Sequence, residues 1–217
     1  MILPIRVTSD FICPWCLIGE ARLAAALARL PAGVEADVEW LPYQLNPQMP
    51  LEGLERRAYR TRKFGSWDRS RVLDAQTVAA AEGSGVVFDY DRIARTPNTL
   101  KAHLLSRHAA KEGRQQRTVK AILTAYFTEG RDIGDTQVLA DIAVAVGLDR
   151  SAAEAAMESE VERAALVAQI AATAAEGFGG VPHFDLAGRH LTGAVSTSRL
   201  LAALRSAAEA QLTAPSP

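Results

Sequence analysis

Residues 9–16 read Ser9-Asp10-Phe11-Ile12-Cys13-Pro14-Trp15-Cys16 and contain both cysteines of this 217-residue chain. Two residues separate the thiols, so one helical turn can hold both sulfurs within bonding distance. The pair can then change between dithiol and disulfide without a large movement. The spacing therefore predicts a site for reversible two-electron redox chemistry.

The flanking residues predict that Cys13 lies at the N-terminus of a helix. Residues 2–8 suit a short buried strand, and the residues after Cys13 suit a helix with Pro14 in its first turn, where proline is tolerated. The unpaired amides and the positive dipole end of a helix favour a thiolate, which is the form of cysteine that attacks a disulfide. We therefore predict that Cys13 is the nucleophile.

Cys16 is predicted to be the resolving thiol. It lies one turn inside the expected helix, on an apolar face, and should be less exposed than Cys13. That face is completed by Leu23, Leu27 and Leu30. Pro14 and Trp15 lie between the thiols, so we expect them to contact the substrate and to influence the reduction potential. The direction of electron flow is left open by the sequence.

A zinc site, a structural disulfide and chance spacing are the alternatives for a C-x-x-C pair. Zinc would need two more ligands, and without further cysteines these would be histidines or carboxylates. His103 and His108 have a ligand-like spacing but lie far from Cys16 in the sequence. On one helix their side chains would point about 140° apart. We therefore predict no metal site.

Composition indicates an intracellular enzyme. Two cysteines are too few for the disulfide framework of a secreted scaffold. The start of the chain lacks a basic region followed by an apolar run and a small-residue cleavage site, so we expect a cytoplasmic protein. No apolar segment approaches the roughly 20 residues of a membrane helix, and no membrane association is predicted.

Charge gives no indication of nucleic-acid binding. The formal net charge is −1, so the chain has no general attraction to polyanions. The basic run at residues 56–63 is interpreted as the solvated face of a helix rather than as a binding patch. Tyr59, Phe64 and Trp67 are candidates for lining a cleft over the active site, with core packing as the alternative.

The order of expected elements favours a small domain that carries an insertion. Apolar residues alternate in a strand at 34–40, and three prolines mark a boundary loop at 41–50. Helical spacing follows at 72–81, 100–109, 119–127 and 138–146, and two more helical runs lie within 151–175. The chain then returns to a hairpin at 181–192 and a final helix capped by Ser196 or Thr197.

The sequence resembles the DsbA-type thioredoxin-like oxidoreductases and, among them, the cytoplasmic FrnE-like branch. The resemblance covers nearly the whole chain and is carried by residues 9–19, 45–50 with Glu52-Gly53, Asn98-Thr99 with Ala102-His103, 125–130 and 180–184. It implies an α/β protein with a thioredoxin-like fold and a large all-helical insertion. Residues 1–45 and 155–217 would form the discontinuous thioredoxin-like domain, and residues 46–154 the inserted helical domain.

The resemblance also implies that Cys13 and Cys16 are the active-site pair and that Pro182 is a cis-proline facing them. An X-Pro bond that enters a strand after a glycine run is a favoured place for a cis peptide. A cis bond would expose the backbone of Val181, which could pair with an extended substrate segment. His183 replaces a threonine that is usual in the branch, and residues 193–195 are also less typical. We predict that Val181 and His183 contact the substrate; His183 could also influence the Cys13 thiolate, point into the core or point to solvent.

The leading hypothesis is a thiol–disulfide oxidoreductase that acts on protein or small thiol and disulfide substrates and needs no cofactor, with glutathione as a candidate redox partner. The first alternative is a glutathione-dependent isomerase or transferase of the 2-hydroxychromene-2-carboxylate isomerase type. Those enzymes typically have serine at the position of Cys13 and lack the second thiol. The second alternative is a chaperone-like binding protein with incidental thiols. A homodimer is left open.

Overall fold

A four-stranded sheet built from both ends of the chain forms the centre of the fold. The computed structural model describes residues 1–213, so the last four residues of the predicted segment 155–217 lie outside the described residues. The strand order is β2-β1-β5-β6, with β1 (Ile2–Ser9) parallel to β2 (Glu35–Pro42) and antiparallel to β5 (His183–Leu186). The β5–β6 hairpin is closed by β6 (Arg189–Thr192). The two predicted N-terminal strands and the hairpin are therefore confirmed.

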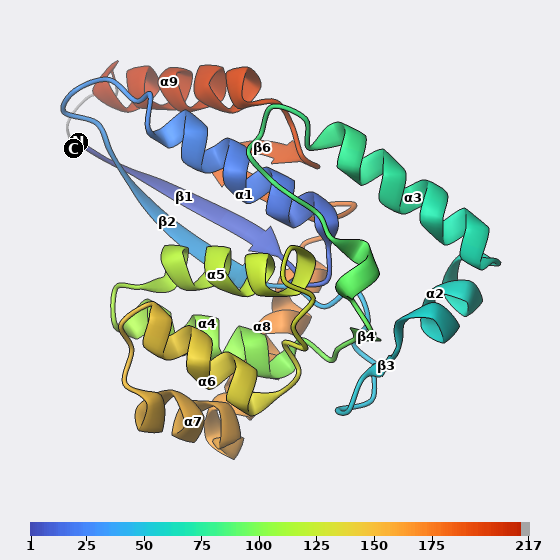
Figure 1. The fold of residues 1–217 in the computed structure, drawn as a ribbon. Helices are drawn as coiled ribbons and strands as arrows, with labels where there is room; N and C mark the ends of the chain where they lie inside the picture. The colour runs from blue at the N-terminus through green and yellow to red at the C-terminus, as the bar shows by residue number, and fades with distance from the viewer. Residues whose placement is uncertain (214–217) are drawn as a thin grey trace.

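Alternate residues of β1 are buried, as expected for a strand with one covered face. Leu3, Ile5 and Val7 are at most 1% exposed, whereas Arg6 is exposed and pairs with Asp185 of β5. The helices α1 (Pro14–Leu27) and α9 (Thr197–Thr213) pack side by side along the sheet (Figure 1).

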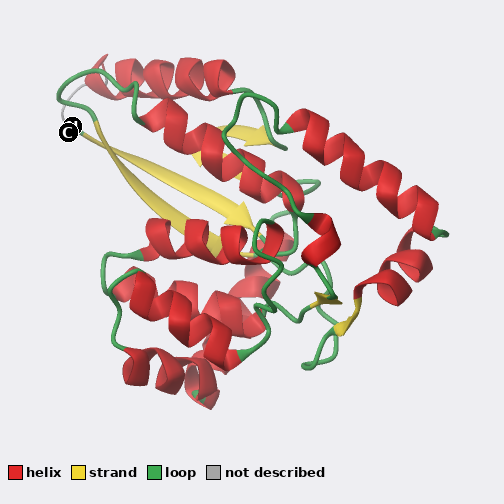
Figure 2. Ribbon diagram, in the orientation of Figure 1, coloured by secondary structure: helices red, strands yellow, loops and turns green. Residues whose placement is uncertain are grey.

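The helices between β2 and β5 form two groups, which Figure 1 shows at the right and at the lower left of the view. The first group contains α2 (Arg56–Phe64) and α3 (Trp67–Ala80). The second group contains α4 (Leu100–Lys111), α5 (Gln115–Phe127), α6 (Thr136–Ala145), α7 (Arg150–Glu158) and α8 (Glu160–Ala175). This arrangement, seen as the predominance of helix in Figure 2, confirms the α/β fold with a helical insertion.

Three features of the insertion were not predicted. Residues 54–55 and 95–96 form a two-stranded sheet from β3 (Leu54–Glu55) and β4 (Arg95–Thr96), a single 3-10 turn spans η1 (Tyr90–Arg92), and α2 is a helix separate from α3. The predicted boundary between residues 154 and 155 falls within α7, so the division into two domains stays a prediction. None of the helices within residues 1–213 is long and apolar enough to cross a membrane.

Arg22 of α1 holds the first helical group against the sheet domain. Its guanidinium donates to the carbonyl of Ala80 at the end of α3 (2.5 Å) and to that of Ala194 (2.5 Å), in the loop before α9. Because the other end of α3 joins α2 through a two-residue link, this anchor also fixes where α2 lies relative to the start of α1.

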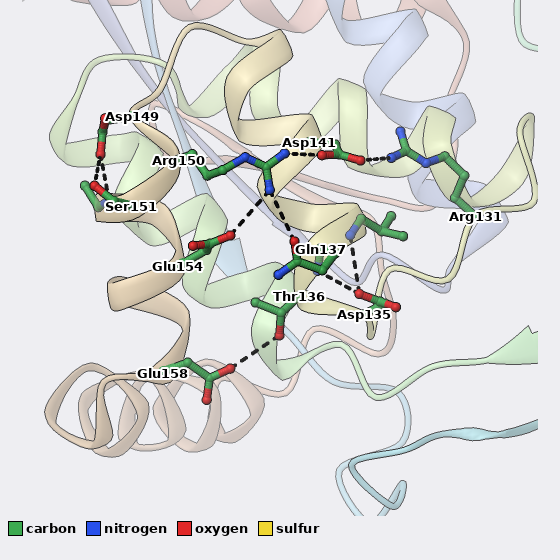
Figure 3. Close-up of polar contacts among 12 residues, drawn as sticks. Arg131, Asp135, Thr136, Gln137, Asp141, Asp149, Arg150, Ser151, Glu154 and Glu158 are labelled. Atoms are coloured by element: carbon green, nitrogen blue, oxygen red, sulfur yellow. Dashed lines mark hydrogen bonds and ion pairs between the residues drawn. The ribbon is translucent and has the colours of Figure 1, made fainter.

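The second helical group is joined at its surface by a chain of ion pairs (Figure 3). Arg150 of α7 donates to Asp141 and Gln137 of α6, and Asp141 also accepts from Arg131. These side chains are partly exposed, so the network orients α6 and α7 but contributes only modestly to stability.

Glu20 of α1 is a buried carboxyl that faces a crevice between α1, α5 and residues 84–87. It is 2% exposed, and burial raises its pKa, with Lys120 of α5 offsetting part of the shift. Because the pKa of Glu20 is higher in the folded protein than in the unfolded chain, the protonated carboxyl makes its full contribution to the free energy of unfolding below the unfolded pKa. This contribution is lost as the pH rises through the folded pKa.

We therefore expect Glu20→Gln to be more stable than the wild type at pH 7–8, by about 1–2 kcal/mol, with the difference disappearing near pH 4. Urea unfolding across this pH range measures the effect. The exposed Glu112→Gln is the control for the change in net charge. Equal stability of Glu20→Gln and the wild type at every pH would show that the Glu20 carboxylate is fully hydrated.

Candidate active site

Cys13 is the N-cap of α1, and Pro14 is the first residue of the helix. The backbone amide of Cys13 donates to the carbonyl of Asp10 (3.1 Å), and the amide of Cys16 donates to the carbonyl of Cys13 (3.0 Å). The structure holds both cysteines as thiols. This geometry confirms the predicted helix start and places the thiol of Cys13 at the positive end of the helix dipole.

The two thiols differ in burial in the predicted order. Cys13 is 4% exposed and lines a cavity, whereas Cys16 is fully buried. Burial raises the pKa of the Cys16 thiol well above its ordinary value, and the neighbouring Cys13 raises it further. Cys16 is therefore held as a thiol at neutral pH, which is suited to the second step of a disulfide exchange.

The Val181–Pro182 bond is cis, as predicted, and lies against the start of α1. The thiol of Cys13 donates to the carbonyl oxygen of Val181 at 3.5 Å. Gly19 permits this approach, since a Cβ at that position would lie 2.9 Å from Cγ of Pro182. Cys13, Cys16 and the Val181–Pro182 turn are thus brought together from opposite ends of the sequence.

His183 is the first residue of β5, and its ring contacts His190 and Thr192 of β6. Its ring stacks on Phe178 at 4.4 Å and on His190 at 5.4 Å, and Nδ1 lies 2.9 Å from Oγ1 of Thr192. Burial and the neighbouring His190 lower the pKa of His183. These contacts hold residues 178–183, the segment that contains Val181. The predicted substrate contact of His183 stays a prediction.

Asp10 and His103 form a buried pair behind the cysteine motif that sequence reasoning did not assign to the site. Asp10 is fully buried, and its Oδ1 lies 3.5 Å from Nε2 of His103, which is also 3.0 Å from the carbonyl of Tyr43. The other oxygen of Asp10 accepts from the amide of Leu45 (2.7 Å). Asp10 acts on the pKa of Cys16 in both directions: a hydrogen bond with its backbone lowers that pKa, and its charge raises it by less. The feature of the sequence that could have identified Asp10 is its position three residues before Cys13.

A cavity of about 360 Å³ lies directly beside Cys13. Residues at the start of α1, including Pro14 and Trp15, line the cavity together with residues of α2 and α3. Aromatic side chains contribute much of the lining: Tyr59 and Phe64 of α2, and Tyr90, Tyr126 and Phe127. Tyr59 and Phe64 therefore line a cleft over the site, as one of the two alternatives predicted, whereas Trp67 packs against the guanidinium of Arg56.

The interpretation of residues 56–63 as a solvated helix face is wrong for Arg56 and Arg60. Arg56 is 5% exposed and donates to one carboxylate oxygen of Asp74 (2.7 Å), and Arg60 donates to the other (2.7 Å). Burial lowers the pKa of Arg60, and Asp74 acts in the opposite direction. Both arginines line the cavity beside Cys13, as does the exposed Lys63.

Solved structures with this fold include redox proteins and an isomerase. A probable DsbA oxidoreductase of Streptomyces coelicolor is 26% identical, with a TM-score of 0.85 over 99% of this chain and 93% of that chain. A 2-hydroxychromene-2-carboxylate isomerase is 18% identical, with a TM-score of 0.69 over 99% and 100%. The cytosolic disulfide reductase DsbM of Pseudomonas aeruginosa, solved with GSH, is 21% identical, with a TM-score of 0.58 over 98% and 100%. The last two similarities bear on the fold alone.

Sequence comparison identifies the family. A curated Bacillus subtilis protein, the uncharacterized protein YwbO, is 31% identical over 173 residues, which are 76% of this chain and 79% of that protein. The family described as the DSBA-like thioredoxin domain matches residues 5–205, a range that includes both cysteines and the cis-proline turn. The chain therefore belongs to the DsbA-like thioredoxin-domain family.

Proposed function

We propose that the protein is a thiol–disulfide oxidoreductase that works through Cys13 and Cys16. The observation that carries this proposal is the asymmetry of the two thiols. Cys13 caps a helix beside a cavity and a backbone carbonyl, and Cys16 is buried behind it with a raised pKa. Membership of the DsbA-like family supports the same chemistry.

The reaction proceeds in two exchanges. The Cys13 thiolate attacks one sulfur of a substrate disulfide, forms a mixed disulfide and releases the other half as a thiolate. Cys16 then gives up its proton and attacks the Cys13 sulfur, which forms the Cys13–Cys16 disulfide and releases the second half. The substrate gains two electrons and the protein loses two, and the two thiol protons end on the released thiolates. The reverse sequence donates the disulfide.

The remaining parts of the site bind and position the substrate in this proposal. Trp15 is 38% exposed next to Cys13, so Pro14 and Trp15 form the rim that a substrate meets first. Val181 offers backbone groups beside the reacting sulfur, and Pro182 holds that backbone in place. We further propose a cytoplasmic protein of the FrnE-like branch, with glutathione as a redox partner. The fold shared with DsbM, solved with GSH, supports glutathione as a candidate.

A redox titration tests the proposal. We expect reduced and oxidised glutathione mixtures to drive a single two-electron transition between the dithiol and the Cys13–Cys16 disulfide, seen by thiol alkylation with mass spectrometry and by Trp fluorescence. The midpoint gives the direction of electron flow, since potentials near that of thioredoxin favour reduction of substrates and those near that of DsbA favour oxidation. The control is Cys13→Ser, which cannot form the Cys13–Cys16 disulfide.

The same titration separates the alternatives. If no intramolecular disulfide forms at any glutathione ratio, the oxidoreductase proposal fails. Glutathione-dependent isomerisation of 2-hydroxychromene-2-carboxylate by the reduced protein would then support the isomerase alternative. This chain shares the fold of a 2-hydroxychromene-2-carboxylate isomerase. Suppression of aggregation that survives replacement of both Cys13 and Cys16 by serine would support the binding protein.

A further inference from the structure

The cavity beside Cys13 carries an excess of positive charge. Its lining residues include three basic side chains, Arg56, Arg60 and Lys63, and one acidic side chain, Asp74. Asp74 is shared between the two arginines, each of which donates to a separate carboxylate oxygen. One carboxylate thus balances two guanidinium groups, and one positive charge in the wall is left uncompensated.

Lys63 adds a second positive charge at the same wall. Its ammonium donates to the amide oxygen of Asn46 (2.8 Å) and to the hydroxyl of Tyr59 (2.8 Å), both of which are neutral. Charged groups that are removed from water are normally paired with an opposite charge. The side chain of Arg60 is only 16% exposed, and no second carboxylate lines the cavity to balance the two arginines that share Asp74.

The shape of the site favours a small molecule over a folded protein. The cavity of about 360 Å³ falls in the size range of small-ligand pockets, and residues of α1, α2 and α3 line it. The aromatic rings in the lining provide an apolar surface for the body of a ligand. A ligand that places sulfur at Cys13 would extend its other end toward Arg60 and Lys63.

We propose that this cavity selects a low-molecular-weight disulfide or thiol with a carboxylate group, which Arg60 and Lys63 bind while its sulfur reacts with Cys13. The proposal rests on the oxidoreductase function given above and names its substrate class. Arg60 keeps its own bonds to Ser70 and Asp74 through Nε and Nη2, so a carboxylate would bind it through Nη1. A guanidinium N–H group and a terminal ammonium both form charge-assisted hydrogen bonds to a carboxylate.

Three disulfides of nearly equal size test the selection by charge. The reduced protein is mixed with dithiodipropionate (anionic), hydroxyethyl disulfide (neutral) or cystamine (cationic), and the rate of Cys13–Cys16 oxidation is followed by Trp fluorescence. Each rate is divided by the rate of the same disulfide with free mercaptoethanol, which removes differences in intrinsic reactivity. We expect the anionic disulfide to exceed the neutral one by about tenfold or more and the cationic one to be slowest.

The variants separate recognition from chemistry. Arg60→Gln and Lys63→Gln should each lower the rate with dithiodipropionate about tenfold relative to the rate with hydroxyethyl disulfide. Arg71→Gln, on the exposed side of α3, makes the same change in net charge and should leave all three rates as in the wild type. High salt should reduce the anionic preference of the wild type.

A binding measurement keeps the test independent of the redox reaction. Cys13→Ser should bind dithiodipropionate, detected by Trp fluorescence, and should bind hydroxyethyl disulfide at least tenfold more weakly. Equal normalised rates for the three disulfides, together with equal binding by Cys13→Ser, would overturn the proposal. In that case the glutathione titration would still show the Cys13–Cys16 couple if the oxidoreductase function is correct.

Discussion

Cys16→Ser is expected to stop the reaction at the mixed disulfide, and Cys13→Ser is expected to prevent it from starting. Without Cys16, the Cys13 sulfur stays bound to one half of the substrate, because serine cannot attack a disulfide. Without Cys13, the buried Cys16 is not accessible to substrate, and oxidation of the protein should slow by at least about a thousandfold. Intact-mass spectrometry after mixing with dithiodipropionate shows a one-to-one adduct in the first variant and none in the second.

The raised pKa of Cys16 gives this prediction a pH dependence. Only the thiolate resolves the mixed disulfide, and below its pKa the thiolate fraction increases tenfold for each unit of pH. The release of the second substrate half by the wild type should therefore accelerate as the pH rises through the neutral range, while the adduct of Cys16→Ser stays stable. Alkylation of the native protein provides the control, since iodoacetamide should modify Cys13 first. Preferential modification of Cys16 would reverse the assigned roles.

The parts of the site that the sequence predicted depend on local signals. Pro14 and the spacing of the cysteines define a helix start, and this start alone determines that Cys13 is at the cap and Cys16 is inside. The cis peptide before Pro182 was expected from the glycine run and from the family resemblance, and the structure confirms it. Membership of the DsbA-like family is also confirmed, whereas the FrnE-like branch stays a prediction.

The parts that were missed or left open depend on partners distant in the sequence. Residues 56–63 contain five basic side chains and give the pattern of a solvated helix, so their burial depends on Asp74 in the middle of α3. The orientation of His183 depends on the register of the hairpin, which places it opposite Thr192. Neither contact has a local signature, since each requires knowledge of how two elements pack.

Asp74→Ala is expected to be the most destabilising single change in the cavity wall. Asp74 is 8% exposed and is the common partner of Arg56 and Arg60. Its removal leaves two adjacent guanidinium groups without a counterion in a largely buried place, which typically costs about 3–5 kcal/mol. For a chain of this size the melting temperature should fall by roughly 10 °C. The control is Asp68→Ala, an exposed acid in the first turn of α3, which should cost about 1 kcal/mol or less.

A second substitution identifies the cause of the loss. Adding Arg60→Met to Asp74→Ala removes one of the two facing charges, so the double variant should recover part of the lost stability, as a double-mutant cycle measures. In a Cys13→Ser background, where the Cys13–Cys16 disulfide cannot form, dithiodipropionate should raise the melting temperature more when Asp74→Ala is present than when it is absent, because an added carboxylate can take the place of the missing one. A loss below about 1 kcal/mol in Asp74→Ala would mean that water solvates the two guanidinium groups well enough to replace the missing carboxylate. The charge excess of the cavity would then provide little energy for binding an anion.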